Sequence, residues 1–464
     1  MVQDVKVETR TTSSWNLVPQ KMFSSARWLI PVILVLASLG MSWTVTAFHS
    51  EAFSPRDEWV YLDYLEKLPD QGFIHQGEEI GTGPLSRMAC DGVRDYGPMG
   101  TACDASTGDL SSFPQQGINT ADIYTPLYFA TTLVPATAIA AVTGLDLLQA
   151  ARYTGGLWLA GTMVLLSGLF RSFRVPSVAI LGLGLAYIGS PLAWWTYTYI
   201  STDAPTLAFA AGALWVARRV IEGTTRPWIL VALSVVGVLF KVTNILTVGL
   251  VVLYLLITAI RDILRRKRNT KALWRPTRAE TRLIVAAAAS AVAALVSQMI
   301  WLIIRSMSAV GPSPDQGNLG ILGVHELGRL AVMTIPDTLM SNSTITGSGD
   351  NSYKIPGYIV DPLSWICIVG VVGGLIFLSS RSREPALNIA TAIACTLFIP
   401  VLAIALSQVQ GTYFALPARY GAPLAASMLL GAGLLINNRW ASYAVLLYGG
   451  LLVTYVISNA ASLA

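Results

Sequence analysis

Long apolar segments separated by short polar stretches fill most of the chain from residue 28 onward. Most of these segments are close to the ~20 residues that a helix needs to cross the hydrocarbon core of a bilayer. The pattern predicts an all-α, polytopic membrane protein with about 11–12 membrane segments. The predicted segments are 28–48, 124–145, 149–170, 176–196, 203–219, 227–241, 243–260, 282–304, 362–380, 386–408, 419–436 and 440–459.

Basic residues gather in short blocks between these segments, most densely in residues 261–282, which begin with RDILRRKRNTK. Cytoplasmic loops carry an excess of Lys and Arg, so this block should be cytoplasmic. If 124–145 crosses the membrane, Arg171 and Arg174 fall on the outer side, against the same rule. If 124–145 does not cross, every basic block that separates two predicted crossings falls inside.

The segment 124–145 is therefore predicted not to cross. It contains Pro126 and Pro135, which favour a broken, re-entrant or interfacial helix pair. We predict eleven true crossings and one re-entrant element, with residues 1–27 as a cytoplasmic N-terminal tail. Residues 28–464 then form one transmembrane domain of a multi-pass plasma-membrane protein whose active face is external.

Composition supports the membrane class and excludes nucleic acid as a partner. Of 464 residues, 53% are apolar and 12% are charged, and the mean hydropathy is +0.57. A soluble domain carries about 25% charged residues. The net charge of +5 comes from basic blocks between apolar segments, which is the distribution expected of a membrane protein and not of a nucleic-acid-binding surface.

Two large polar loops are predicted on the outer side, at 49–122 and 305–361. Cys90 and Cys103 both lie in the first loop, and an external location predicts a disulfide between them. A zinc site is the alternative, but two cysteines without nearby histidines make an incomplete ligand set.

The strongest local signal for chemistry is SPRDEWVYLDYLEKL, residues 54–68, which follows the first apolar segment. Asp57 and Glu58 precede an amphipathic, aromatic helix pattern that is typical of an external interfacial helix. Acidic residues at that point can simply complement the helix dipole as caps. Alternatively, they can accept a proton from a hydroxyl, or hold a divalent ion such as Mg or Mn against a phosphate.

Other polar residues occur where predicted helices begin or break on the outer side. Asp203 ends the aromatic stretch WWTYTYISTD, where a capping role is the alternative to chemistry. Lys241 interrupts two short apolar segments, and either snorkels to the interface or binds phosphate. Arg419, followed by Tyr420, opposes the positive-inside distribution, which indicates an anionic partner.

Several segments, in this order, resemble motifs of the GT-C superfamily of integral-membrane glycosyltransferases. The first-loop acidic pair is followed by a proline-leucine-tyrosine segment, an arginine at a helix start, a second external acid, and lysine-threonine and arginine-tyrosine motifs. A single Pro126 stands where the family carries a proline pair. The segments are RDEW (56–59), ADIYTPLYFATTLVP (121–135), AARYTGGLW (150–158), STDAP (201–205), LFKVT (239–243) and ARYGAPLA (418–425).

The resemblance implies an inverting transferase that moves a sugar from a polyprenyl-phosphate donor to an envelope glycan or glycolipid acceptor. It makes Asp57 the candidate base, with Glu58 or Asp203 supporting it or holding an optional divalent metal. The candidate ligands of such a metal are Asp57 and Asp203. In the same interpretation, Arg56 beside the acidic pair is a supporting residue. The implied donor-phosphate ligands are Lys241, Arg419 and Tyr420.

Two other functions are consistent with the sequence. A membrane transporter or lipid-sugar flippase would also be polytopic, although transporters carry ionisable residues in mid-membrane more often than at helix ends. A non-catalytic partner that keeps the fold of a transferase is the third hypothesis. The sequence contains no Walker-type or Rossmann-type phosphate loop, so a nucleotide donor is not indicated.

Overall fold

A computed structural model describes residues 23–103, 108–270, 275–313, 357–377, 384–410 and 418–463, with isolated positions at 416 and between 326 and 335. Most of the predicted tail (1–27) and most of the predicted second loop (305–361) lie outside these ranges. Within them the chain is helical, with isolated β-bridges and no strand. The predicted all-α polytopic class is confirmed at this level.

Helices occupy all twelve predicted apolar segments and part of the first loop. Their bounds are α1 Phe23–Phe48, α2 Glu58–Gln71, α3 Thr82–Cys90, α4 Pro126–Thr143, α5 Leu147–Ser172, α6 Ser177–Ile188, α7 Pro191–Thr198, α8 Thr206–Ile221, α9 Pro227–Phe240, α10 Ile245–Thr270, α11 Arg278–Met307, α13 Gly357–Phe377, α14 Glu384–Gln410, α15 Ala422–Leu435, α16 Arg439–Ser458 and α17 Ala460–Leu463. Short 3-10 helices include η4 Thr120–Ile123, η5 Val242–Asn244 and η6 Ala418–Gly421.

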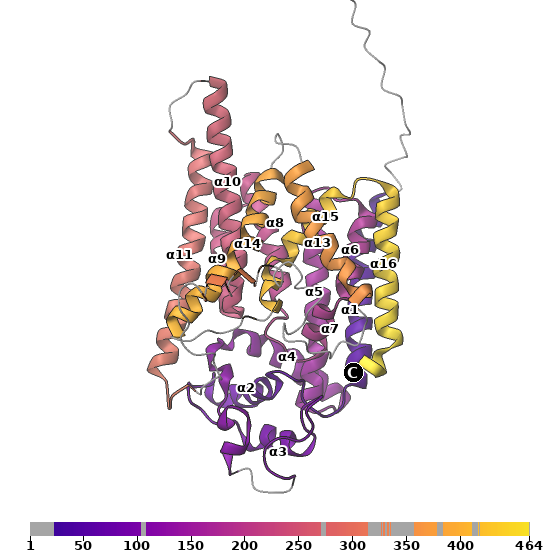
Figure 1. The fold of residues 1–464 in the computed structure, drawn as a ribbon, viewed down its shortest axis with the longest axis vertical. Coiled ribbons are helices and arrows are strands. Elements are labelled where there is room, and N and C mark those ends of the chain that lie inside the picture. The colour runs from indigo at the N-terminus through magenta and orange to yellow at the C-terminus, as the bar shows by residue number, and fades with distance from the viewer. Residues whose placement is uncertain are drawn as a thin grey trace, which may run out of the picture.

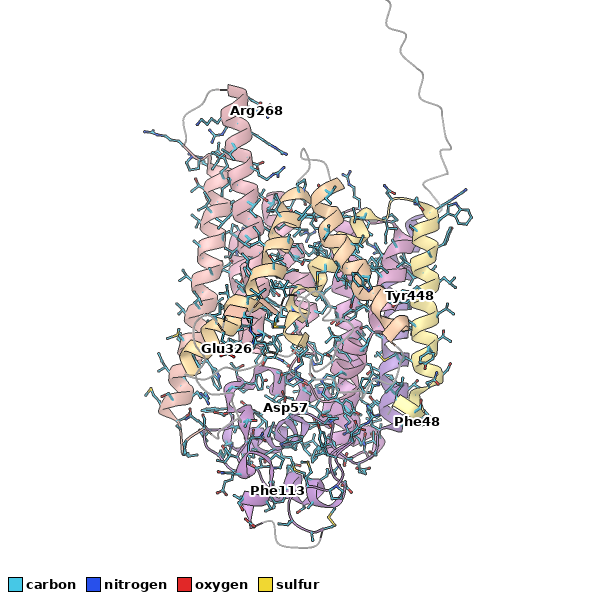
Figure 2. The ribbon with its side chains drawn as sticks, viewed as in Figure 1. Phe48, Asp57, Phe113, Arg268, Glu326 and Tyr448 are labelled. Carbon is cyan, nitrogen blue, oxygen red and sulfur yellow. A yellow bond between two sulfur atoms is a disulfide. The ribbon has the colours of Figure 1, made fainter. Side chains whose placement is uncertain are left out.

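The molecule has a bundle of long helices with a compact cap at one end (Figure 1). The cap is formed by residues 49–122, which include α2 and α3, and we call it the loop domain. At the opposite end, the tips of α10 and α11 project beyond the other helices, with Arg268 near the tip (Figure 2). The basic block and the loop domain therefore lie at opposite ends of the bundle.

Seven of the described helices are long and apolar enough to cross a membrane, or eight if the bent pair α6–α7 is one span. The predicted segment 176–196 is this pair, bent by 63°. The bend has a local cause, because Ser190 caps α7 through the Ala193 N–H at 3.2 Å and Pro191 occupies the first turn. The total of eleven crossings stays a prediction.

The prediction of a broken helix pair at 124–145 is wrong in form, because α4 is one continuous helix that tolerates Pro135. Thr125 caps its start and Gly144, with φ 75°, ends it in the left-handed conformation. By length and hydropathy, α4 counts among the seven candidates. Its position nevertheless favours a helix that does not cross, since both ends lie toward the loop domain.

The evidence for this position comes from residues that flank α4. Just before it, the Tyr124 hydroxyl lies 3.5 Å from the Tyr61 hydroxyl of α2. Just after it, Asp146 accepts a bond of 2.6 Å from Arg87 of α3. The following helix α5 then runs away from the loop domain toward Arg171, as the charge distribution requires.

α10 continues as a helix through the basic block to Thr270, ten residues beyond the predicted end of the segment at 260. Leu, Arg and Lys favour helix, so the polar sequence does not end α10. The side chain of Arg266 in α10 bonds Glu280 in α11 at 2.9 Å, and Glu280 forms a capping box with Thr277. The described ends of α10 and α11 are therefore joined by an ion pair, and we call these two helices the α10–α11 hairpin.

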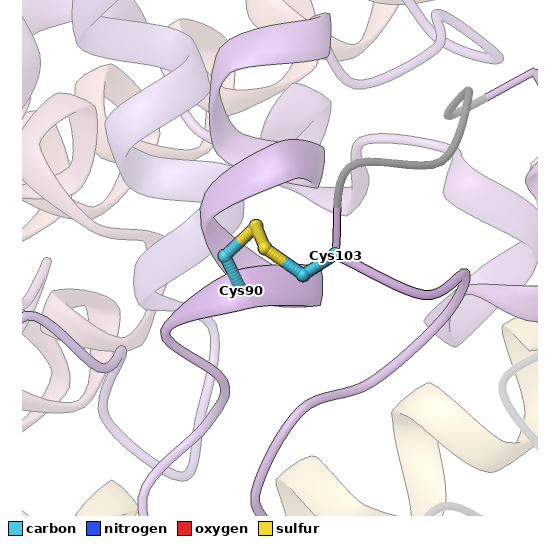
Figure 3. The surroundings of a disulfide bond; sticks show 2 residues. All are labelled: Cys90 and Cys103. Carbon is cyan, nitrogen blue, oxygen red and sulfur yellow. A yellow bond between two sulfur atoms is a disulfide. The ribbon is translucent and has the colours of Figure 1, made fainter.

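A disulfide joins Cys90 at the end of α3 to Cys103, as expected from the sequence (Figure 3). The link closes a short loop at the end of α3 and ties it covalently to this helix, which supports the fold of the small loop domain. Cys367 and Cys395 are buried in α13 and α14.

Replacing Cys90 and Cys103 together by serine should make the loop domain less stable by about 3 kcal/mol, the value for closing a loop of similar length. Limited proteolysis of the purified protein, with and without reductant, measures the change. Reductant should accelerate cleavage of the loop domain in the wild type only. Equal cleavage rates of wild type and double variant without reductant would show that the link does not stabilise this domain.

Candidate functional site

The start of α2 is fixed to the bundle by a buried ion pair between Glu58 and Arg152 of α5. Both side chains are 0% exposed. The Arg152 Nη2 and Nε atoms donate to the two Glu58 carboxylate oxygens at 2.8 and 3.0 Å. The backbone N–H groups of Ser54 and Ile200 donate to the same carboxylate at 2.7 and 3.0 Å. Glu58 thus joins the loop domain to α5 and to the segment after α7.

Arg152 uses its remaining donors on the same loop. Its Nη1 and Nη2 atoms donate to the carbonyls of Ser50 and Ala52 at 2.8 and 2.7 Å. The assignment of Glu58 as a catalytic residue is therefore corrected to a structural role. Its carboxylate already accepts four hydrogen bonds and is closed to solvent, so it is not available to a substrate.

Asp57, directly before Glu58, has a different environment. Its backbone is left-handed, with φ 58° and ψ −8°, and its side chain makes no capping bond to the described backbone of α2. This conformation costs a residue other than glycine about 1 kcal/mol. The side chain is 40% exposed, so it can meet a molecule that approaches from outside. Asp57 thus occupies the N-cap position of α2, but it does not cap the helix through a side-chain hydrogen bond.

Asp57 is the outer member of a line of alternating charges. Arg419 Nη2 donates to Asp57 Oδ2 at 3.3 Å, and Arg419 Nε lies 3.7 Å from Asp203 Oδ2. Lys241 Nζ donates to Asp203 Oδ1 at 2.5 Å. Asp203 and Lys241 are 6% and 3% exposed, so the inner pair is closed to bulk water and the outer pair is not.

These four residues come from distant parts of the chain, and each lies where a helix begins or breaks. Asp57 precedes α2, Asp203 precedes α8, Lys241 separates α9 from η5, and Arg419 lies in η6 before α15. Irregular backbone inside a membrane bundle is tolerated where protein or a polar cavity satisfies it. Figure 2 shows Asp57 near the junction of the loop domain and the bundle.

Tyrosines surround the inner charges. Lys241 Nζ lies 5.9 Å from the ring centre of Tyr124 and 5.8 Å from that of Tyr420, within the range of cation–π attraction. The Tyr61 hydroxyl is 3.4 Å from Thr202 Oγ1. Burial, with the nearby Tyr124 and Asp57, raises the pKa of Tyr61 well above its ordinary value, so this phenol stays protonated and can donate a hydrogen bond.

Residues at the start of α4, at the end of α9 and in α11 line a small depression beside Lys241. Its lining includes the polar side chains of Tyr124, Thr125 and Gln298 as well as apolar side chains from the end of α9.

The residues do not fit a resident divalent metal. Asp57 and Asp203, the predicted ligands, both face Arg419, whose guanidinium already occupies the position between them. Among the residues that the structure describes, no group of three His, Cys, Asp or Glu side chains could hold a metal. The positive charge of this site comes from Arg419 and Lys241. Arg56 lies beside the site by sequence, with its carbonyl bonded to Ser54 Oγ at 2.8 Å.

The structure therefore brings together Asp57, Asp203, Lys241, Arg419 and Tyr420, all of which were predicted as site residues. It adds Tyr61 and Tyr124, which were not. Tyr61 belongs to the aromatic pattern of residues 54–68 and Tyr124 to the segment ADIYTPLYF, but neither was distinguishable there from residues that only pack.

No protein-family model matches the sequence, and no curated protein matches it either. The resemblance to the GT-C superfamily thus depends on the order of the motifs, and it stays a prediction.

Glu58→Gln should lower the free energy of unfolding by about 3–5 kcal/mol, because it leaves the buried Arg152 guanidinium without its counter-charge. Thermal unfolding in detergent measures the loss. The matched control is Glu51→Gln, which removes a carboxylate that is 61% exposed and should change stability by about 1 kcal/mol or less.

The double variant Glu58→Gln/Arg152→Gln should lose less stability than the sum of the two single variants, because the second change removes the unpaired charge. Additive losses, or a Glu58→Gln protein as stable as the Glu51→Gln control, would contradict the role of this pair.

Proposed function

We propose that the protein is an integral-membrane glycosyltransferase that uses a polyprenyl-phosphate sugar as its donor. The observation that carries the proposal is the line of charges from the half-exposed Asp57 through Arg419 to the buried Asp203–Lys241 pair. It combines a carboxylate that can accept a proton with two cations that suit a phosphate. Such a donor already carries its leaving group, so no nucleotide-binding loop is required.

The reaction is a single displacement at the anomeric carbon. The acceptor hydroxyl oxygen forms a bond to that carbon while the bond from the carbon to the phosphate oxygen breaks, with inversion. The hydroxyl proton moves to the Asp57 carboxylate, and the bonding electron pair leaves on the polyprenyl phosphate. Atoms and charges balance without a further reactant.

Arg419 and Lys241 would stabilise the negative charge that develops on the departing phosphate. Arg presents a planar fork that can donate two bonds to a phosphate, and Lys adds a compact charge. Preorganised cations at the leaving group lower the barrier because they need not reorient during the reaction. Asp203 holds both cations in place, since it contacts Lys241 at 2.5 Å and Arg419 at 3.7 Å.

The charge distribution supports an external location for this site. The basic tip of the α10–α11 hairpin lies at the end of the bundle opposite the loop domain (Figure 1). By the positive-inside rule, that tip would be cytoplasmic and the loop domain would face the outside of the plasma membrane. An acceptor at that face would be an envelope glycan or glycolipid.

Asp57→Asn should reduce sugar transfer by at least ~100-fold, because the amide cannot take the proton of the acceptor hydroxyl. A deletion strain that carries the wild-type or variant protein allows the test, with glycan analysis of the envelope as the measurement. The strain with Asp57→Asn should lack the same sugar type as the deletion.

The matched control is Asp70→Asn, an exposed carboxylate at the end of the same helix, which should restore the glycan fully. Both variants should reach the membrane in wild-type amounts, since Asp57 is part-exposed and contacts Arg419 at the outer end of the site. Normal glycans with Asp57→Asn would remove Asp57 from the reaction.

A further inference from the structure

The carboxylate proposed as the base is engaged by a cation in the structure. Within the described residues, the ion-pair partner of Asp57 is Arg419, at 3.3 Å. The Arg419 guanidinium donates to Asp57 Oδ2, so it competes with an acceptor hydroxyl for this carboxylate. The contact that organises the site therefore also limits the access of an acceptor hydroxyl to Asp57.

Arg419 has a second place to bind. Its Nε atom faces Asp203, which also holds Lys241, so Arg419 can release Asp57 and stay beside the inner charges. A phosphate that reaches Lys241 would be within reach of the same guanidinium. Phosphate offers Arg a paired set of acceptor oxygens, which the single contact to Asp57 Oδ2 does not.

Asp57 cannot follow Arg419, because its backbone is held on both sides. The neighbouring Glu58 is fixed by Arg152 and by the Ser54 N–H, and Ser54 Oγ donates to the carbonyl of Arg56. A movement of the guanidinium toward a phosphate must therefore lengthen or break its bond to Asp57.

We infer that Arg419 is a ligand-operated mask: it pairs with Asp57, as in the structure, and releases this carboxylate when a lipid phosphate binds beside Lys241. This inference rests on the proposed function and adds to it an order in which the two substrates bind. The donor must bind before Asp57 can accept the proton of the acceptor hydroxyl. Without the donor, the acceptor hydroxyl meets an Asp57 carboxylate that is still paired with Arg419.

Carbodiimide-promoted amidation of carboxylates, with glycinamide as the amine, tests the mask without requiring sugar transfer. Undecaprenyl phosphate is the probe, because it has the phosphate but no sugar that would cover Asp57. Peptide mass spectrometry then measures labelling of Asp57 in the wild-type protein. Labelling should rise by about two- to fivefold on addition of the probe, the factor that corresponds to one part-exposed ion pair.

Three controls test whether the release of Arg419 causes the change in Asp57 labelling. Labelling of Asp70 should not change, and the uncharged alcohol undecaprenol should not affect Asp57. Arg419→Gln should show high labelling of Asp57 with or without the probe. If that variant does not fold, Arg419→Lys, which keeps the charge but loses the planar fork, should respond more weakly than the wild type.

Labelling of Asp57 that falls or stays constant when undecaprenyl phosphate binds to the wild type would overturn the mask. Failure of the mask is distinct from failure of the proposed function. Loss of glycan in the Asp57→Asn strain together with unchanged labelling would keep the transferase and reject the mask. A labelling response together with normal glycans in the Asp57→Asn strain would keep the release of Asp57 by Arg419 and reject Asp57 as the base of the proposed reaction.

Discussion

The bidentate pair between Glu58 and Arg152 determines where the candidate site can form. Two ionised groups with no exposure to water are stable only if they satisfy one another and their remaining hydrogen-bonding capacity. Here the remaining capacity is taken up by the backbone of the loop that precedes α2 and by Ile200 after α7. The same contacts thus fix the conformation of this loop, the start of α2 and the position of α2 against α5, and they leave Asp57 outside the pair.

The four charges of the site show how a membrane bundle can keep ionisable residues at helix ends. Asp57, Arg419, Asp203 and Lys241 alternate in sign, so each buried charge has a partner within 4 Å. Pairing reduces the penalty of desolvation, and it also leaves a system in which a new anion can compete for the cations. The stability of the site and the proposed exchange of its cations with a phosphate would then depend on the same contacts.

Much of the fold could be predicted from the sequence, because hydropathy is a local property. All twelve apolar segments are helical, and the order of basic blocks agrees with the opposite positions of the hairpin tip and the loop domain. The extent of α10 and the continuity of α4 were not predicted. In both cases packing and helix propensity outweigh the local signals, which were charge in one helix and Pro135 in the other.

The candidate site could be predicted in part. Asp203, Lys241 and Arg419 interrupt apolar sequence, and that interruption is visible without a structure. The different roles of Asp57 and Glu58 cannot be predicted from the sequence, because they depend on Arg152, which lies 94 residues after Glu58 in the chain. A pairing between distant residues is a tertiary property, and two adjacent acids look alike until their partners are known.

The central claim is that a bond between sugar and phosphate is broken at this site. The direct measurement uses purified protein in liposomes with a set of polyprenyl-phosphate sugars and a membrane extract as the source of acceptor. We predict release of free polyprenyl phosphate in amounts equal to the glycosylated product, detected by mass spectrometry. Movement of the intact lipid-linked sugar between leaflets, without release of polyprenyl phosphate, would contradict the claim and indicate a flippase.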